Sequence, residues 1–243
     1  MPFLCVARSH VGCRRKLNED AVLCTPNLPL WAVADGMGGH EAGEVASALI
    51  VQKLAECGAD AGADLMVRTH AARQAVLEAN GELLAMAGER TIGATVVLMA
   101  ADEHAWSCLW AGDSRAYQAR NGALSQLSRD HSLVQELVDA GELDPLEAAT
   151  HPNANVIRRA VGATPQLELD FVHGDLADQD TFLLASDGLT RVISDEEILV
   201  GLSASDLEQA ADTFLETTLA RGAPDNVSLI LIRFVSAPSP AGA

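Results

Sequence analysis

The sequence predicts an α+β fold in which helices pack outside a stacked pair of antiparallel sheets. Strand-like and helix-like segments do not alternate along the 243 residues, and this order argues against a doubly wound parallel sheet. Several strand-like runs are instead joined by tight turns, of which Asn121-Gly122 is the strongest signal, so antiparallel hairpins are expected. We expect a single domain over residues 1–235 and a disordered tail over residues 236–243.

The first part of the chain predicts three strands and two helices. Short apolar runs punctuated by Pro and Asn are typical of strands. Two longer segments have apolar residues at every third or fourth position, which is typical of helices. The strands are expected at residues 3–7, 21–24 and 30–34, and the helices at residues 41–57 and 64–87.

The rest of the chain predicts a meander of strands, an irregular insertion, and then two helices before a last strand. The insertion covers residues 130–162, with a short helix at 132–140. We interpret it as a flap, because long loops of this kind often border a functional site. The further strands are expected at residues 94–101, 105–111, 115–119, 124–127, 167–172, 181–185 and 227–235, and the helices at 195–202 and 205–221.

The composition is strongly acidic, with a net charge of −18. A field of this sign repels phosphate polymers, so it argues against nucleic acid or an anionic membrane as a partner and favours a metal cation. The N-terminus lacks a signal-peptide pattern, and no apolar run is long enough to span a membrane, so we expect a soluble, cytoplasmic protein. The five cysteines contain no CxxC pair and are expected to be reduced thiols.

Residues 30–50, LWAVADGMGGHEAGEVASALI, predict an apolar strand, a glycine cluster and a helix. This is not a phosphate-binding loop, because Glu44 and Val45 stand where that loop has Lys and Ser or Thr, and Asp35 would repel phosphate. A carboxylate at the end of a strand, followed by glycines that permit close backbone approach, suits a hard cation. The alternative is a tight turn in which Asp35 accepts a local hydrogen bond.

Two further carboxylates border apolar strands. The segment FLLASDGL runs from a strand into Asp187 and Gly188, and Asp225 precedes the last strand. An ionised carboxylate beside a hydrophobic core costs free energy unless it is paired or binds a metal. We therefore interpret Asp35 and Asp187 as ligands of a shared site and Asp225 as a third carboxylate there. Ordinary turn chemistry is the alternative for Asp225.

Seven short motifs follow one another between about Ser9 and Arg233: RKLNED, ADGMGGH, GAT, AGDSRAY, RDHS, SDGL and APDNVS. In this order they resemble the PPM (type 2C) family of metal-dependent protein serine/threonine phosphatases. The DGMGGH form and the compact length resemble the stand-alone bacterial branch of that family. The resemblance implies a four-layer α-β-β-α sandwich with metals in a cleft at one edge of its two sheets.

The resemblance also implies a centre that holds two Mn²⁺ or Mg²⁺ ions. Asp35 would bridge the two ions. The carbonyl of Gly36 and the carboxylate of Glu19 would ligate one of them, and Asp187 and Asp225 would ligate the other. Such hard ions retain several waters, so few protein ligands are needed.

Three more residues take roles from the same resemblance. Asp20 would orient water at the metals, and Asp113, in AGDSR, would contribute to a third, weaker metal site. Arg15 lies five residues before Asp20, which is the family spacing for the arginine that holds the substrate phosphate. The planar guanidinium can bind two phosphate oxygens at once. Because Arg14 and Lys16 flank Arg15, a solvated basic run is the alternative.

The implied reaction is direct hydrolysis of phosphoserine or phosphothreonine by a water or hydroxide that bridges the two metals. A cysteine-based phosphatase is excluded, because no cysteine is followed by an arginine six positions later. The leaving alkoxide needs a proton, and His40 is the candidate donor. A local hydrogen-bonding role is the alternative for His40, and His131 and His151 are rivals for the role of donor.

The expected partners are phosphorylated proteins and a cognate serine/threonine kinase of the eukaryotic type, including one that regulates a secretion system. The flap would affect substrate choice and product release, and the protein is expected to be a monomer. Two other functions stay open: a metal-dependent phosphatase of small phosphoesters, and a catalytically silent module that binds phosphoproteins. A silent module would be expected to lose metal ligands, whereas Asp35, Asp187 and Asp225 are all present.

Overall fold

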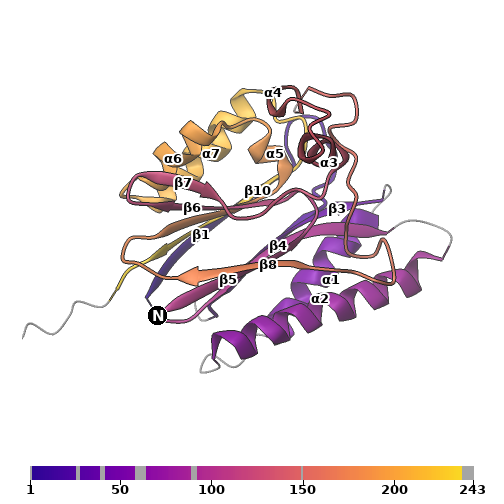
Figure 1. Cartoon of the computed structure of the whole chain (residues 1–243), viewed down its shortest axis with the longest axis horizontal. Helices are drawn as coiled ribbons and strands as arrows, with labels where there is room; N and C mark the ends of the chain where they lie inside the picture. The colour runs from indigo at the N-terminus through magenta and orange to yellow at the C-terminus, as the bar shows by residue number, and fades with distance from the viewer. Residues whose placement is uncertain are drawn as a thin grey trace, which may run out of the picture.

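A computed structural model of the chain describes residues 2–25, 28–38, 42–57, 64–88, 92–148 and 150–236. Within these residues the strands form two stacked antiparallel sheets, and helices cover the outer face of each sheet (Figure 1). This arrangement confirms the α+β sandwich with two central antiparallel sheets. Of the predicted tail, residues 237–243 lie outside the described residues.

The first sheet joins strands from the two ends of the described chain. In spatial order its strands are β1 (Phe3–His10), β10 (Val227–Phe234), β9 (Thr181–Ala185), β6 (Arg115–Arg120) and β7 (Ala123–Gln126). β1 and β10 pair along their whole length, from Phe3 opposite Phe234 to His10 opposite Val227. β10 is buried at every position, which explains its apolar run from Leu229 to Ile232.

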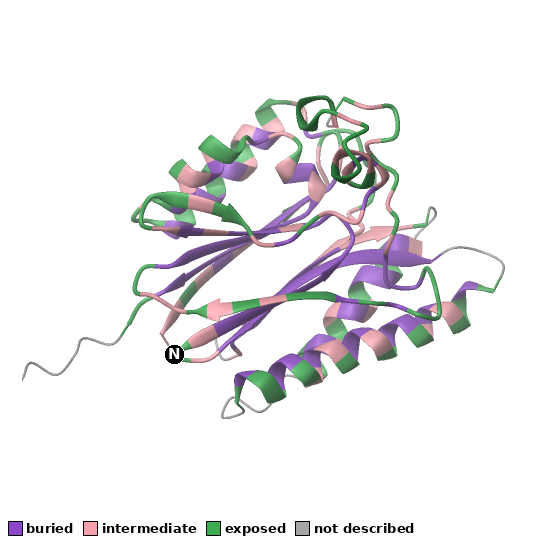
Figure 2. Ribbon diagram, viewed as in Figure 1, coloured by how far each residue is buried: buried purple, intermediate pink, exposed green. Residues whose placement is uncertain are grey.

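The second sheet is built from strands of the N-terminal half and one strand that follows the flap. In spatial order its strands are β2 (Asp20–Cys24), β3 (Leu30–Met37), β4 (Gly93–Ala101), β5 (Ala105–Ala111) and β8 (Asp170–Asp175). The layer between the two sheets includes the large side chains Trp31, Trp106 and Phe182. Figure 2 shows the inner strands as buried across both sheets.

Two sets of helices form the outer layers, and each buries one face against its sheet (Figure 2). The helices are α1 (Ala42–Cys57) and α2 (Leu65–Ala87) on the second sheet, α5 (Asp187–Thr190), α6 (Asp195–Leu202) and α7 (Leu207–Ala220) on the first sheet, and α3 (Leu133–Asp139) and α4 (Pro145–Ala148) in the flap. No helix within the described ranges is both long and apolar enough to cross a membrane.

Side-chain caps explain where the longer helices begin. Asp64 accepts a hydrogen bond from the Met66 amide at 2.7 Å, which starts α2. Ser194 and Glu197 form a reciprocal capping box at the start of α6. Such caps satisfy amides of the first turn that have no partner inside the helix.

β1 and β3 each extend three residues beyond their predicted ends, to His10 and Met37, and the structure differs further from the sequence prediction in three places. The strand expected at residues 167–172 is β8, which starts only at Asp170, because Leu167 and Leu169 pack instead into the helix–sheet core. The flap contains a second helical turn, α4, that was not predicted. The short helix α5 was also missed, because its four residues are too few for a helical periodicity to show in the sequence.

Candidate metal and phosphate site

The acidic residues singled out in the sequence meet at one edge of the sandwich, and they come from both sheets. Asp20 on β2 lies directly opposite Asp35 on β3 in the second sheet. Asp187 begins α5, immediately after β9 of the first sheet, and Asp225 lies just before β10 of the same sheet. Each sheet therefore supplies about half of the acidic cluster.

Glycines allow the backbone to pack tightly around Glu19. The amide of Gly36 donates to the carbonyl oxygen of Glu19 at 3.1 Å. A Cβ atom on Gly36 would lie 2.2 Å from the carbonyl oxygen of Gly43, and a Cβ atom on Gly43 would lie 2.6 Å from Oε1 of Glu19. Both positions therefore require glycine, and together they bring the Glu19 carboxylate and the Gly36 backbone into one small space.

Asn226 ties the loop that carries Glu19 to the start of β10. Its side-chain oxygen accepts a hydrogen bond from the Glu19 amide at 2.9 Å, and its side-chain amide donates to the carbonyl oxygens of Val11 and Leu17 at 2.9 Å each. The side chain thus satisfies three backbone groups of the β1–β2 loop. It holds that loop against the first sheet, beside Asp225.

Ser186 connects the two sheets directly beneath the acidic cluster. Its hydroxyl donates to Oδ2 of Asp20 at 2.9 Å and accepts from the Ser228 amide at 3.0 Å. The other carboxylate oxygen of Asp20, Oδ1, is buried without a hydrogen-bond partner. Asp20 is therefore held in one orientation, with one oxygen available.

The carboxylates raise one another's pKa values. Burial, together with the nearby Asp187 and Asp225, raises the pKa of Asp20 to about 7, although Ser228 and Ser186 oppose the shift. Burial, followed by the charges of neighbouring carboxylates with Asp20 foremost, raises the pKa of Asp35 well above its usual range. These shifts mean that the cluster is electrostatically unfavourable without cations.

Asp113 joins the same cluster from the β5–β6 connection. Its side chain is 5% exposed, and its Oδ1 atom has no hydrogen-bond partner. Burial and the charge of Asp187 raise the pKa of Asp113 to about 7, while Arg191 acts in the opposite direction. A buried carboxylate oxygen without a partner is a strong reason to look for a cation.

Two arginines contact the cluster. Nη2 of Arg15 lies 2.7 Å from Oδ2 of Asp225, and the Arg15 side chain is 48% exposed. Nη2 of Arg191 lies 2.9 Å from Oδ2 of Asp187 and 3.1 Å from Oδ2 of Asp113. Arg15 is therefore at the mouth of the site, where it can turn toward a phosphate, whereas Arg191 lies between two carboxylates.

The donor set fits a hard divalent cation. It consists of carboxylate and backbone oxygens, two of which are buried without partners, at Asp20 and Asp113. Across the described residues, no three Asp, Glu, His or Cys side chains are grouped as a metal ligand set, and three of the carboxylates are engaged by arginines instead. Bound metals would thus compete with these arginines for the carboxylates.

The candidate proton donor His40 lies outside the described residues, whereas both of its rivals are described. The His131 ring stacks on Trp110, and its Nδ1 atom accepts a hydrogen bond from the Gly112 amide at 3.1 Å. Nδ1 of His151 accepts from the Asn153 amide at 3.1 Å, within a turn of the flap. Both rivals therefore have contacts that explain them structurally, and His40 stays a prediction.

Sequence reasoning missed Arg191 and the linking roles of Ser186 and Asn226. The spacing of four residues between Asp187 and Arg191 was a usable signal, because such pairs lie on one face of a helix. This spacing could not be interpreted from the sequence, because α5 itself was not predicted. The links made by Ser186 and Asn226 join strands far apart in the sequence, so no local pattern reports them.

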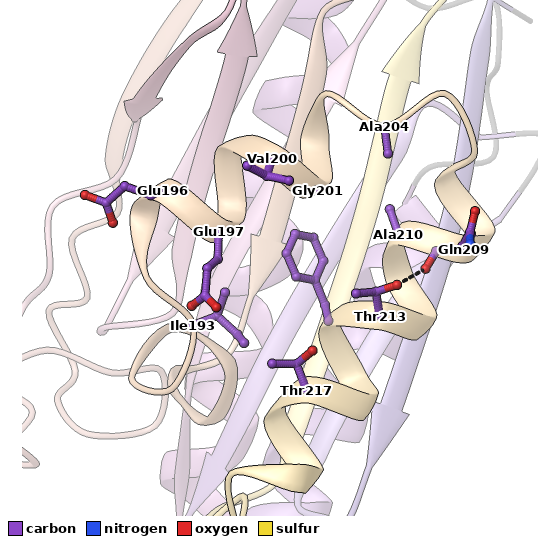
Figure 3. A pocket seen from close by; sticks show the side chains of 11 residues that line it. Ile193, Glu196, Glu197, Val200, Gly201, Ala204, Gln209, Ala210, Thr213 and Thr217 are labelled. Carbon is purple, nitrogen blue, oxygen red and sulfur yellow. Dashed lines mark hydrogen bonds between the residues drawn. The ribbon is translucent and has the colours of Figure 1, made fainter.

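One cavity lies beside the flap and another lies beside α6 and α7, and of these two only the first contacts the acidic cluster. A cavity of about 270 Å³ lies between the flap and the pair formed by Asp113 and Asp187. A cavity of about 460 Å³ lies between α6 and α7 (Figure 3). Its lining is largely apolar, and its charged residues are Glu196 and Glu197, so it does not suit a phosphate group.

The raised pKa of Asp20 predicts how the metal-free protein responds to pH. Because this pKa is about 7 in the folded protein against an ordinary value of 3.8, the stabilising proton is present at low pH and is lost as pH rises through 7. Asp20→Asn removes this dependence. In EDTA, we expect the melting temperature of the variant to exceed that of the wild type by about 5 °C or more at pH 8, and this difference should shrink steadily as the pH falls from 7 toward 3.8.

Thermal unfolding followed by circular dichroism at several pH values measures this difference. The comparison between the two proteins cancels the contribution of titrating groups that do not interact with Asp20, while the response of its carboxylate neighbours is part of the measured difference. A difference in melting temperature that does not change with pH would contradict the prediction.

The family profile and the relatives that match this sequence are all protein phosphatases. The profile described as Protein phosphatase 2C matches residues 8–231. The serine/threonine protein phosphatase PstP of Mycobacterium tuberculosis is 37% identical over 227 residues, which cover 93% of this chain but only 44% of the relative. The serine/threonine phosphatase stp of Listeria monocytogenes is 35% identical over 215 residues, which cover 85% of this chain and 84% of the relative.

Solved structures agree with the sequence comparison. PppA, described as a key regulatory component of the type VI secretion system in Pseudomonas aeruginosa, matches with a TM-score of 0.88 and 42% identity, covering 96% of this chain and 98% of that one. The catalytic domain of PstP in complex with two manganese ions matches with a TM-score of 0.86 and 35% identity, covering 96% and 99%. Together with the profile match over residues 8–231, these likenesses show that the chain belongs to the protein phosphatase 2C family.

Proposed function

We propose that the protein is a metal-dependent phosphatase that hydrolyses phosphoserine and phosphothreonine in proteins. The observation that carries the proposal is the meeting of buried carboxylates from both sheets with Arg15 at the mouth of the site. A cluster of this kind is stabilised by bound cations, and an exposed arginine beside it can hold the phosphate of a bulky substrate.

Each carboxylate takes a role that its position supports. Asp35 lies among the other carboxylates and would bridge two Mn²⁺ or Mg²⁺ ions. Glu19 and the Gly36 carbonyl would hold one ion, and Asp187 and Asp225 would hold the other. When bound, these ions would lower the pKa of a water molecule and neutralise phosphate charge.

The protein's other groups bind and orient the reacting partners. Arg15 would leave Asp225 and bind two phosphate oxygens through its planar guanidinium. Asp20, which is held by Ser186, would accept a hydrogen bond from the attacking water and so fix its direction. His40 would donate the proton to the leaving oxygen. Asp113 would contribute to a third, weaker metal site.

The relatives support the choice of substrate and metal. PstP and stp are named serine/threonine phosphatases, and the PstP catalytic domain has been solved with two manganese ions. We infer that this protein acts in the cytoplasm as a monomer, on phosphoproteins made by a cognate serine/threonine kinase. The likeness to PppA supports a kinase that regulates a secretion system.

Release of phosphate from a phosphothreonine peptide tests the proposal. We expect turnover with Mn²⁺, none after EDTA treatment, and recovery when Mn²⁺ is restored. Hydrolysis confined to small phosphoesters would favour a small-molecule phosphatase. Binding of the phosphopeptide without turnover would favour a silent binding module.

Arg15 and its neighbour Arg14 form a matched pair for testing phosphate binding. Both side chains are exposed and the two residues are adjacent in the sequence, but of the two only Arg15 contacts the acidic cluster. Arg15→Ala should raise KM for the phosphopeptide about 10- to 100-fold, because a charge-assisted, two-pronged contact is lost. Arg14→Ala should leave KM within about twofold of the wild type.

Steady-state kinetics over a range of peptide concentrations measures both values of KM. Arg15→Lys should recover only part of the loss, because an ammonium group cannot bind two oxygens in the same plane. If the Arg14 and Arg15 substitutions raised KM equally, both arginines would attract the substrate only through their positive charge, and Arg15 would not hold the phosphate.

A further inference from the structure

The groove between α6 and α7 is shaped by a glycine. It has a volume of about 460 Å³, and its lining includes Gly201 of α6 and Ala210 and Phe214 of α7 (Figure 3). A Cβ atom on Gly201 would lie 2.1 Å from Cζ of Phe214, so the missing side chain lets the phenyl ring lie against α6. Glycine is less favourable than alanine inside a helix. Here it leaves a depression between the two helices, which we call the α6–α7 groove.

The surface of this groove offers mainly carbon atoms. Val200 forms an exposed apolar edge, with 73% of its surface accessible, whereas Ile198 and Leu202 of the same helix are buried in the core. On α7, the hydroxyl of Thr213 donates to the Gln209 carbonyl oxygen at 2.8 Å (Figure 3). This hydroxyl is thus used inside its own helix. A partner that covered the groove would remove apolar surface from water.

The lining residues recur along both helices at intervals of three to four, so each helix lends one side to the groove. α6 has eight residues, and its length of about 12 Å matches about two turns of a further helix. A helix laid between two others packs its side chains into the groove that they form. The lining positions are residues 196, 197, 200 and 201 on α6 and residues 209, 210, 213, 214 and 217 on α7.

The rim of the groove is acidic. Residues 195–221, which span α6 and α7, contain seven acidic residues and a single basic one, Arg221, which already pairs with Glu197 at 2.6 Å. Glu196 lines the groove, and Glu216 lies three residues beyond a lining residue, on a neighbouring helical position. Both carboxylates are exposed, and neither forms an ion pair with any residue that the structure describes.

The acidic rim selects among the partners that an apolar groove could bind. It repels anionic membranes and nucleic acids. A second copy of the chain would bring the same acidic helices and the same net charge of −18, so self-association through this face is unfavourable. A segment that carries apolar side chains on one face and Lys or Arg beside them complements both the lining and the rim.

We propose that the α6–α7 groove is a docking site for a basic amphipathic helix of a partner protein. The apolar face of this helix lies between α6 and α7, with an apolar side chain over Gly201 and Phe214. Its Lys and Arg side chains pair with Glu196 and Glu216. Amphipathic helices commonly bind apolar grooves in this way. The groove shares no residue with the acidic cluster, so docking does not depend on the function proposed above.

Titration with a synthetic peptide tests the docking site. The probe is a helix of about 14 residues made only of Leu and Lys, with Leu at the spacing of one helical face, and the control probe has Glu in place of Lys. We expect the Leu/Lys peptide to shift the methyl NMR signals of Ala204, Ala210 and Thr213, with a Kd of about 10–100 μM. The Leu/Glu peptide should leave these signals unchanged.

Val200→Asn tests the apolar contact. The side chain is exposed, so the substitution removes the apolar edge without disturbing the core, and the Kd of the Leu/Lys peptide should rise about tenfold. Val67→Asn is the matched control, because Val67 is 60% exposed on α2, and its Kd should stay within about twofold of the wild type. The melting temperature of each variant should stay within about 2 °C of the wild type, which excludes misfolding.

A double substitution, Glu196→Gln with Glu216→Gln, tests the acidic rim. At low salt it should raise the Kd about tenfold and reduce the dependence of the Kd on salt. The control, Glu78→Gln with Glu103→Gln, changes the net charge equally on α2 and the β4–β5 turn. It should leave the Kd within about twofold.

Four outcomes overturn the docking site. The first is that neither peptide binds, and the second is that the Leu/Glu peptide binds as tightly as the Leu/Lys peptide. The third is a set of shifts spread evenly over the acidic surface and unchanged by Val200→Asn, which would show general charge attraction. The fourth is a shift of the same methyl signals when the protein is concentrated without peptide, which would show that a second copy fills the groove.

Discussion

Asp35→Asn is expected to lower kcat/KM for a phosphothreonine peptide about a thousandfold or more, even at saturating Mn²⁺. Burial, together with the charges of carboxylates from both sheets, raises the pKa of Asp35 well above its ordinary value, so Asp35 lies among the other carboxylates of the cluster. An amide has one oxygen in place of two and carries no negative charge, so it cannot bridge two cations. Turnover and bound Mn²⁺ should therefore fall together.

The same substitution should stabilise the metal-free protein near neutral pH, because it removes the free-energy cost of a carboxyl group whose pKa is raised by burial and by neighbouring carboxylates. A raised melting temperature in EDTA, combined with lost activity, would show that the loss is not caused by misfolding. Asp195→Asn is the matched control: Asp195 is exposed in the first turn of α6, and its substitution should leave turnover within about twofold. Activity of Asp35→Asn near that of this control would show that the proposed metal ligands are wrong.

Gly188→Ala is expected to destabilise the protein by about 3 kcal/mol or more and to impair metal binding. A Cβ atom at this position would lie 1.8 Å from the carbonyl oxygen of Asn226. The clash is with backbone, so either α5 or the start of β10 has to move. Asp187 adjoins Gly188 and Asp225 adjoins Asn226, so this movement would separate two proposed ligands of one ion.

A second helical glycine provides the control. Gly81 is exposed in α2, and a Cβ atom there would meet nothing within 4 Å. Gly81→Ala should therefore stabilise the protein by about 0.5–1 kcal/mol, because alanine favours helix. Chemical denaturation with and without Mn²⁺ measures both effects. Equal stability changes for the two variants would mean that the close packing at Gly188 is not needed.

The sequence predicted the elements of the fold well where they are long and periodic. The strands from Gly93 to Ala111 and helix α2 have enough residues for their hydrophobic patterns to appear, and the hairpin at Asn121-Gly122 has a specific turn signature. The order of these elements excluded a parallel sheet. Which strands of the two sheets are neighbours could not be predicted from local patterns, since β1 pairs with β10 from the other end of the described chain.

In the candidate site, too, local sequence patterns identified some residues, whereas others could be found only from the tertiary structure. Asp35, Asp187 and Asp225 were identifiable because a carboxylate beside an apolar strand is energetically unusual. Arg191 was not identifiable, because its contacts depend on a single helical turn and on a flap that folds back over it. Its contacts bring together three separate parts of the sequence, and only tertiary structure reveals them.

The pairing of β1 with β10 has a consequence for synthesis on the ribosome. β1 is made before the other described strands, but it finds its neighbour in the first sheet only after nearly all of the described chain has been made. Contacts between residues so distant in sequence form slowly, and an unpaired strand edge is prone to aggregation. Asp225 directly precedes β10, so the acidic cluster is completed only when this last strand docks. On the proposed function, a nascent chain would therefore be inactive until its fold has closed.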